Sequence, residues 1–225
     1  MRVVRDALAA GARPRRVLVA PELLARLRGG PELLRALRPL EPVELSEAAF
    51  GAIADADTPQ GIAAVFPIEL ARLDVDPSRL LLVLDGLQDP GNLGTIVRSA
   101  VGSGVVGMLA VRGGADPFGP KAVRAAAGAL FRLPVARPGD AELAEALRGR
   151  RVWLAEAGRG ERYDRVDWRA PSALVIGSEA GGASARLRDL ATGRVSIPLS
   201  GELESLNAGV AASILLFEAA RQLNI

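Results

Sequence analysis

The stretch 85-DGLQDPGNLGTIVRSA-100 decides the fold class, because it joins a buried strand to a helix. The apolar run 80-LLLVL-84 precedes it, and Asp89-Pro90-Gly91-Asn92 is a turn signal in which Asn92 suits the N-cap of the following helix. From residue 80 onward, segments typical of strands and helices alternate in this way, which indicates a mainly parallel sheet. The sequence therefore predicts an α/β domain over residues 80–225.

The elements of this domain follow from its apolar runs and its helix-start signals. We expect strands near residues 80–84, 105–111, 151–155, 173–177 and 194–197. We expect helices near residues 92–102, 119–128, 140–148, 184–190 and 206–222. The last helix is long and apolar on most sides, so a second subunit is expected to cover its outer face.

The first 66 residues predict a separate, smaller α/β unit. Pro21 and Pro31 stand where the first turn of a helix would place them. Short strands are expected at 15–20, 42–45 and 61–66. The segment 67-PIELARLDVDPSR-79 is the expected linker. The predicted domains are therefore residues 1–66 and 80–225, joined by residues 67–79.

The composition excludes several classes of protein. Since 49% of the residues are hydrophobic, the chain can bury real cores, which excludes an intrinsically disordered protein. The longest apolar runs are too short to span a bilayer, and we expect no signal peptide. The chain contains no Cys and no His. We therefore expect a cytoplasmic protein without disulfides, without a conventional zinc site and without an imidazole base.

The net charge of +2 is small, but the charges are unevenly distributed. Residues 1–38 contain nine arginines against three acidic residues. Arginine binds phosphates and base edges well, because its planar guanidinium donates hydrogen bonds in pairs. An RNA-binding surface and a set of solvated helix faces are equally compatible with this charge pattern.

Two further Gly-bearing segments, 175-VIGSEAGG-182 and 197-IPLSGELESLN-207, also follow expected strands. Open α/β sheets bind ligands beyond the carboxyl ends of their strands, so such segments are candidate ligand sites. The chain has neither the GxGxxG dinucleotide fingerprint here nor a P-loop anywhere, which disfavours dinucleotide binding and nucleotide hydrolysis. Taken singly, each segment is also explained as an ordinary turn, or as a helix cap formed by Ser205 or Asn207.

Arg98 is an unusual residue in its segment, because the surrounding helix is built mostly of apolar residues and is expected to be packed. We therefore expect a partly buried guanidinium, and such a group needs a partner. An anionic ligand is one candidate for that partner.

Three groups of residues, taken in chain order, carry a family resemblance. They are Asn92 and Arg98, then Gly177-x-Glu179-x-x-Gly182, then Ile197-Pro198 with Ser205-Leu206-Asn207. Together they resemble the SpoU/TrmH family of RNA ribose 2′-O-methyltransferases, in the SPOUT superfamily, over residues 80–225. Residues 1–66 resemble, more loosely, the L30e/L7Ae-type RNA substrate-binding domain that often precedes that catalytic domain. The resemblance implies an α/β fold with a deep C-terminal trefoil knot, although knots are nearly absent from proteins.

The resemblance also implies an enzyme that uses S-adenosylmethionine to methylate a ribose 2′-hydroxyl of structured RNA. No metal is implied, since the sulfonium of this cofactor already activates the methyl group. By this analogy the cofactor is held by Gly177, Ser178, Ile197, Leu199 and Leu206. The ribose hydroxyl is handled by Arg98, with Asn92, Glu179, Ser205 and Asn207 around it. The family further implies a homodimer through the C-terminal domain, with the active site near the subunit interface.

Two roles for Arg98 remain open. The mechanism often proposed for the family makes this arginine a general base, but a guanidinium is effectively never deprotonated in proteins. In the alternative, it clamps an RNA phosphate and donates a hydrogen bond to the developing alkoxide. The N-terminal domain favours ribosomal RNA over transfer RNA as substrate. A non-catalytic RNA-binding or ribosome-assembly factor remains an alternative, and antibiotic resistance remains open as the biological role of the same chemistry.

Overall fold

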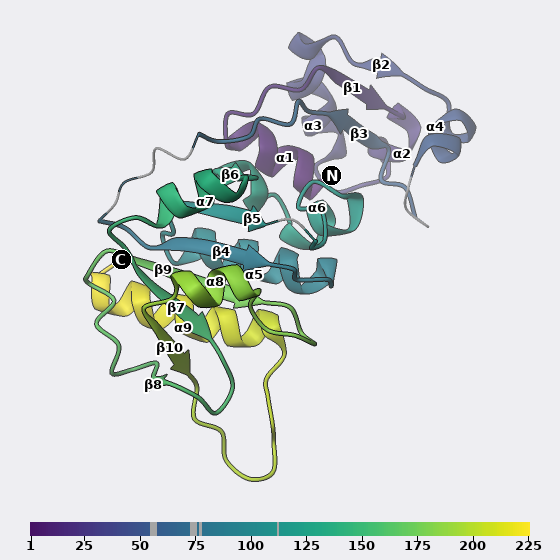
Figure 1. Cartoon of the computed structure of the whole chain (residues 1–225). Helices are drawn as coiled ribbons and strands as arrows, with labels where there is room; N and C mark the ends of the chain where they lie inside the picture. The colour runs from purple at the N-terminus through teal and green to yellow at the C-terminus, as the bar shows by residue number, and fades with distance from the viewer. Residues whose placement is uncertain (55–57, 73–75, 77, 112) are drawn as a thin grey trace. The chain divides into compact units, whose positions relative to one another are not determined.

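The computed structural model of the chain describes every residue except 55–57, 73–75, 77 and 112 (Figure 1). It divides into two units, Met1–Ile68 and Glu69–Ile225. The division falls within the expected linker of residues 67–79, and residues 73–75 and 77 of that linker lie outside the described residues. In the described part of the chain, no helix is long and apolar enough to cross a membrane.

The N-terminal unit is built on a three-stranded sheet with the order β2-β1-β3. β1 (Arg16–Val19) pairs in parallel with β2 (Val43–Glu44) and antiparallel with β3 (Ile62–Val65). Its helical segments are α1 (Arg2–Ala9), α2 (Pro21–Ala25), α3 (Gly30–Leu37), the 3-10 helix η1 (Arg38–Leu40) and α4 (Glu47–Ile53). Pro21 and Pro31 lie in the first turns of α2 and α3, as predicted. Val17, Val19 and Leu24 belong to its small core.

The C-terminal unit is built on a seven-stranded sheet with the order β6-β5-β4-β9-β7-β10-β8, in which each neighbouring pair is parallel. Five strands lie where the sequence predicts them: β4 (Leu81–Asp85), β5 (Gly107–Val111), β7 (Arg151–Ala155), β9 (Ser172–Gly177) and β10 (Gly193–Ser196). β6 (Val135–Ala136) and β8 (Glu161–Arg162) are not predicted, because two residues are too few to form a pattern. The predicted α/β class with a mainly parallel sheet is confirmed.

Helices cover both faces of this sheet. They are α5 (Pro90–Gly102), α6 (Pro120–Ala126), α7 (Asp140–Leu147), α8 (Ala185–Leu190) and α9 (Ala208–Leu223), with the 3-10 helix η2 (Ala129–Arg132). In β4, Leu82 and Leu84 belong to the core shared with α5 and α9, whereas Leu81 and Val83 belong to the core shared with α7 and α8. The strand reads as a continuous apolar run because it is buried on both faces.

α5 and α9 lie side by side and run in the same direction (Figure 1). Ser99 Oγ and Ser213 Oγ are 2.7 Å apart and share a hydrogen bond. A Cβ added at Gly209 would lie 3.2 Å from the Cβ of Thr95, so this glycine lets the two helices approach each other closely. Position 95 is therefore opposite 209, and 99 is opposite 213, which is the register of a parallel helix pair.

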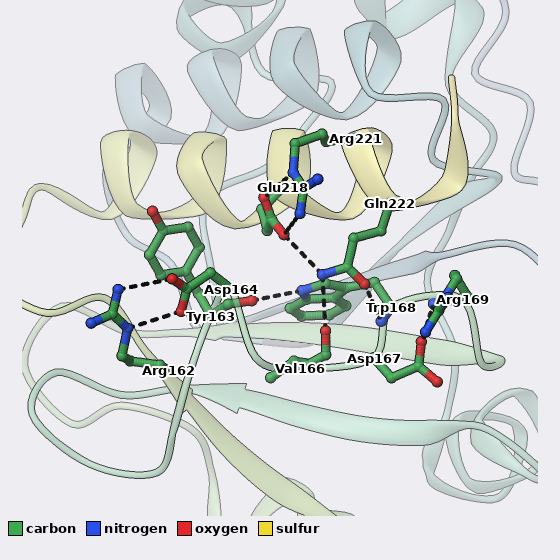
Figure 2. A network of polar contacts seen from close by, with 10 residues as sticks. All are labelled: Arg162, Tyr163, Asp164, Val166, Asp167, Trp168, Arg169, Glu218, Arg221 and Gln222. Carbon is green, nitrogen blue, oxygen red and sulfur yellow. Dashed lines mark hydrogen bonds and ion pairs between the residues drawn. The ribbon is translucent and has the colours of Figure 1, made fainter.

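The segment between β8 and β9 is fastened to the last turns of α9 (Figure 2). Trp168, which is buried, donates its indole N–H to the carbonyl of Tyr163 and its backbone N–H to Oε1 of Gln222, both at 3.0 Å. Gln222 Nε2 donates to the carbonyl of Val166 at 3.0 Å and to Oε1 of Glu218 at 2.8 Å. These bonds hold the C-terminal end of α9, whose N-terminal end contributes to the site described next.

Candidate active site

A cavity of about 360 Å³ lies at the carboxyl ends of β7, β9 and β10. The loop of residues 197–207, which connects β10 to α9 (Figure 1), forms one of its walls together with the first turns of α9. Every predicted site residue except Arg98 lines this cavity: Asn92, Gly177, Ser178, Glu179, Ile197, Leu199, Ser205, Leu206 and Asn207. Three segments that are far apart in the chain therefore meet at one place, where strand ends are expected to bind ligands.

β9 ends in a tight turn that carries Glu179 at its tip. The backbone N–H of Ser178 donates to the carbonyl of Gly182 at 3.0 Å, and the N–H of Gly182 donates back at 2.9 Å. Gly182 has a φ of +65°, which favours glycine. A Cβ added at Gly177 would lie 2.2 Å from the carbonyl carbon of Gly182, so no side chain fits there. The two glycines are therefore required for the turn itself.

Asp85 accepts a hydrogen bond from the chain just after the same turn. It is the last residue of β4, it is only 5% exposed, and its Oδ2 accepts a hydrogen bond from the backbone N–H of Ser184 at 2.5 Å. Ser184 is the N-cap residue of α8, so the carboxylate connects the first motif segment to the start of α8, just after the second segment. Asp85 was not among the predicted site residues, although the sequence places its carboxylate directly after the apolar run 80-LLLVL-84.

A chain of hydrogen bonds connects the three segments. The carboxylate of Glu179 accepts from the backbone N–H of Gln88 and from Nδ2 of Asn92, both at 3.2 Å. Oδ1 of Asn92 accepts in turn from Nδ2 of Asn207 at 2.8 Å. We call Glu179, Asn92 and Asn207 the polar relay. Because each amide has a fixed partner, the relay sets the orientation of both asparagine side chains.

Both helices that start at the relay have capping side chains. α5 begins at Pro90, and its N-cap is Asp89, whose Oδ1 accepts from the backbone N–H of Asn92 at 2.5 Å. The prediction of Asn92 as N-cap was therefore wrong: Pro90 suits the first turn of a helix, so α5 starts earlier and the side chain of Asn92 serves the relay instead. For α9 the N-cap is Asn207, whose Oδ1 accepts hydrogen bonds from the backbone N–H groups of Gly209 at 2.9 Å and Val210 at 3.2 Å.

Glu179 carries a negative charge at neutral pH. Burial raises the pKa of this carboxyl, but hydrogen bonds from its own backbone, from the backbone of Gln88 and from the side chain of Asn92 outweigh burial, so its pKa lies below its ordinary value. A group with a lowered pKa is a poor proton acceptor at pH 7. Glu179 therefore suits a positioning and electrostatic role better than that of a general base.

Arg98 departs from the expectation of a partly buried guanidinium. Its side chain is exposed on the outer stripe of α5, together with Thr95 and Gly102, and it does not line the cavity. It makes no hydrogen bond or ion pair with any residue that the structure describes. The prediction was wrong for the single chain, because the apolar face of α5 turns toward the sheet and α6, which leaves Arg98 on the opposite face.

The cavity fits a nucleoside-sized ligand that carries a positive charge. A volume of about 360 Å³ lies in the range of pockets that bind small molecules. Its walls combine apolar side chains, among them Ile176 and Val195, with the glycine positions Gly177 and Gly182. Glu156 and Glu179 both line it; Glu156 is paired with Arg194, and the ionised Glu179 favours a nearby cation.

The chain matches the model of the SpoU rRNA methylase family over residues 79–217. It is 37% identical, over 175 residues, to the 23S rRNA (guanosine(2553)-2′-O)-methyltransferase RlmP of Bacillus subtilis (strain 168); the alignment covers 77% of this chain and 70% of that protein. The crystal structure of an AdoMet-bound rRNA methyltransferase from Sinorhizobium meliloti is similar with a TM-score of 0.85 and 29% identity, over 99% of this chain and 85% of that chain.

A shorter solved structure, which concerns the 2-OH methylation of C/U34 on tRNA, is similar with a TM-score of 0.57 and 30% identity. It covers 66% of this chain and 99% of its own length. The matched range contains all three motif segments of the sequence. This chain belongs to the SpoU rRNA methylase family.

Proposed function

We propose that the protein transfers a methyl group from S-adenosylmethionine to a ribose 2′-hydroxyl of structured RNA, and that this RNA is ribosomal. The polar relay carries the proposal, because it joins all three motif segments around one cavity. The Sinorhizobium meliloti rRNA methyltransferase is similar over 99% of this chain, whereas the structure concerned with tRNA is similar over 66%. This difference supports ribosomal RNA over transfer RNA.

S-adenosylmethionine supplies a methyl group that its sulfonium makes electrophilic. The residues that would hold it are Gly177, Ser178, Ile197, Leu199 and Leu206, which line the cavity. Gly177 and Ser178 lie at the turn after β9, and Ile197, Leu199 and Leu206 add apolar side chains to the same cavity wall. The ionised Glu179 adds negative charge at the cavity wall.

The polar relay is suited to orient the ribose that receives the methyl group. One N–H of Asn92 is used by Glu179 and one N–H of Asn207 is used by Asn92, so each amide keeps a second N–H for a ligand. The hydroxyl of Ser205 lines the same cavity and is a further donor and acceptor. Groups held in a fixed orientation raise a rate by aligning the reactants before reaction.

A second copy of the chain is proposed to complete the site. Val210 and Phe217 on the outer face of α9 are 47% and 52% exposed, and α5 presents Arg98 on its own outer face. An exposed apolar stripe of this kind indicates an interaction surface, and a two-fold dimer through α5 and α9 would cover it. The unpartnered Arg98 then lies at the subunit interface, where it clamps an RNA phosphate and donates a hydrogen bond to the developing alkoxide.

The N-terminal unit is proposed to bind the RNA substrate, as an L30e-like domain would. Arg13, Arg15 and Arg16 are exposed at the start of β1, and they form no ion pair with residues in the described ranges. Unpaired arginines that are close in sequence suit phosphate binding. The trefoil knot, which the family resemblance implies, and a cytoplasmic location, which the composition suggests, are further parts of this proposal.

Methyl transfer to unmodified RNA tests the proposal directly. The protein is incubated with labelled S-adenosylmethionine and unmodified ribosomal or transfer RNA, and the methylated nucleoside is identified by mass spectrometry. We expect a 2′-O-methyl nucleoside in ribosomal RNA, and none with Arg98→Ala. Label in transfer RNA alone would select the other substrate class. Base methylation would contradict the proposal, and absence of cofactor binding by calorimetry would favour a non-catalytic RNA-binding factor.

A further inference from the structure

We propose that Glu156, oriented by Arg194, forms a subsite for the ribose diol of the nucleoside cofactor. The assignment rests on the proposed function, because it takes S-adenosylmethionine as the ligand of the cavity. The residues named for the cofactor so far contribute backbone groups and apolar side chains. Glu156 would add a charged side chain that reads the sugar.

The backbone of Glu156 is fixed by the sheet. The residue directly follows β7 and lines the cavity with its neighbours Ala155 and Ala157. Its N–H donates to the carbonyl of Val195 at 3.0 Å, which extends the pairing of β7 with β10 by one residue. A ligand-binding side chain on such a position is held more accurately than one on a free loop.

Arg194 orients the carboxylate from outside the cavity. Its Nε lies 3.1 Å from Oε2 of Glu156, and the two side chains are 50% and 21% exposed, respectively. Oε1 of Glu156 accepts no hydrogen bond from the residues that the structure describes. One oxygen is therefore held by the ion pair, while the other is available to a donor in the cavity.

The surroundings select a hydroxyl-bearing ligand for this position. The protein residues next to Glu156 in the cavity wall, Ala155, Ala157, Val195 and Ile197, offer no side-chain donor. A nucleoside presents two adjacent hydroxyl groups, and a carboxylate can accept from them, as acidic residues do in dinucleotide sites. The cavity thus has a place for the sugar as well as for the methyl group.

The two carboxylates of the cavity differ in place and in partners. Glu179 follows β9, next to β4, and belongs to the polar relay that faces the RNA ribose. Glu156 follows β7, which lies next to β9 in the sheet, and is paired with Arg194 instead. This difference in partners assigns Glu179 to the reacting end of the ligand and Glu156 to its nucleoside end.

Calorimetry with ligands that lack single groups tests the assignment. We expect Glu156→Ala to bind S-adenosylhomocysteine at least ten-fold more weakly than the wild type, because a hydrogen bond to a charged group is lost. Among 5′-methylthioadenosine and its 2′-deoxy and 3′-deoxy analogues, removal of a contacted hydroxyl should weaken binding to the wild type about ten-fold and leave binding to Glu156→Ala unchanged. Glu156→Gln keeps the shape of the side chain, so its affinity for S-adenosylhomocysteine should lie between those of the wild type and Glu156→Ala.

One further variant tests the ion pair, and another serves as a control. Arg194→Gln should weaken binding by about three-fold, because the carboxylate loses the partner that orients it. Glu161→Gln should stay within two-fold of the wild type, since Glu161 lies beside Arg194 in a surface hollow and does not line the cavity. Circular dichroism spectra and thermal unfolding midpoints of the variants check that each remains folded.

Three results would overturn the assignment. Affinity of Glu156→Ala for S-adenosylhomocysteine within two-fold of the wild type shows that the side chain does not bind the ligand. A loss confined to S-adenosylmethionine shows that Glu156 serves the sulfonium rather than the diol. If removing a hydroxyl weakens binding to the wild type and to Glu156→Ala by the same factor, Glu156 does not contact the sugar. If the wild type itself binds neither cofactor form, the proposed function fails together with this subsite.

Discussion

The cavity and the outer face of α5 and α9 both include residues of these two helices, yet they differ in how complete they are within one chain. Around the cavity, the side chains of Glu179, Asn92 and Asn207 are hydrogen-bonded to one another. On the outer face, Arg98 has no partner among the described residues and Phe217 is 52% exposed. On the proposed function, this difference predicts that one chain suffices to bind the cofactor, whereas methyl transfer needs a second copy.

This comparison separates two properties that are measured independently. Binding of S-adenosylmethionine reports on the cavity, and the rate of methyl transfer reports on the cavity and the outer face together. A variant of the outer face should therefore change the rate and leave the affinity for the cofactor unchanged.

Replacing Arg98 should have the largest effect. We expect Arg98→Ala to lower kcat about a thousand-fold, because a donor to the developing alkoxide is removed. The affinity for S-adenosylmethionine, measured by calorimetry, should stay within two-fold of the wild type. Arg98→Lys keeps the charge and loses the planar fork, so it should recover only a small part of the rate. A near-normal rate for Arg98→Lys would contradict any special role of the guanidinium.

Phe217→Glu should separate the two copies. Placing a charge in an apolar interface destabilises it, so we expect a monomer by light scattering and a rate of methyl transfer about a hundred-fold lower. Binding of S-adenosylmethionine should survive. Leu40→Glu, at an exposed apolar residue of the N-terminal unit, is the matched control and should leave the oligomeric state unchanged. A wild type that is already monomeric and active would break the comparison.

Asn207 combines a capping role with a place in the polar relay, and two variants separate these roles. Asn207→Ala removes both, so we expect a loss of about 1 kcal/mol in the free energy of unfolding and a lower rate. Asn207→Asp keeps the oxygen that caps α9 but loses the Nδ2 donor to Asn92. It should therefore retain most of the stability and lose about ten-fold in rate. Ser184→Ala, at the N-cap of α8, controls for the loss of a cap alone.

The pH dependence of Glu179 should be the smallest effect. Its pKa is lowered in the folded protein, so the stability that the ionised carboxylate contributes is fully present above its unfolded value, near 4.5, and is lost as the pH falls through the folded pKa. The difference in free energy of unfolding between wild type and Glu179→Gln should be constant from pH 8 to about 5.5 and shrink below 4.5. A difference that changes around pH 7 would show instead that Glu179 titrates there.

Much of the fold could be predicted because it depends on local patterns. The run 80-LLLVL-84 is apolar throughout since β4 is buried on both faces, and this is visible in any sequence. Pro21 and Pro31 mark helix starts for the same local reason. β6 and β8 have two residues each and carry no such pattern. The prediction of Asn92 as N-cap was wrong because Asp89 is the N-cap and Pro90 opens the first turn, so the helix begins before Asn92.

By itself, the sequence determined the α/β class, the segments that belong to the site and the family to which they point. These properties depend on residue type and on order along the chain. The tertiary structure was needed to place Arg98 outside the cavity, Asp85 against Ser184, and Glu156 at the end of the strand between β9 and β10. The reason is that these relations depend on which face of a helix packs and on which strands become neighbours, and both are set by long-range packing rather than by local sequence.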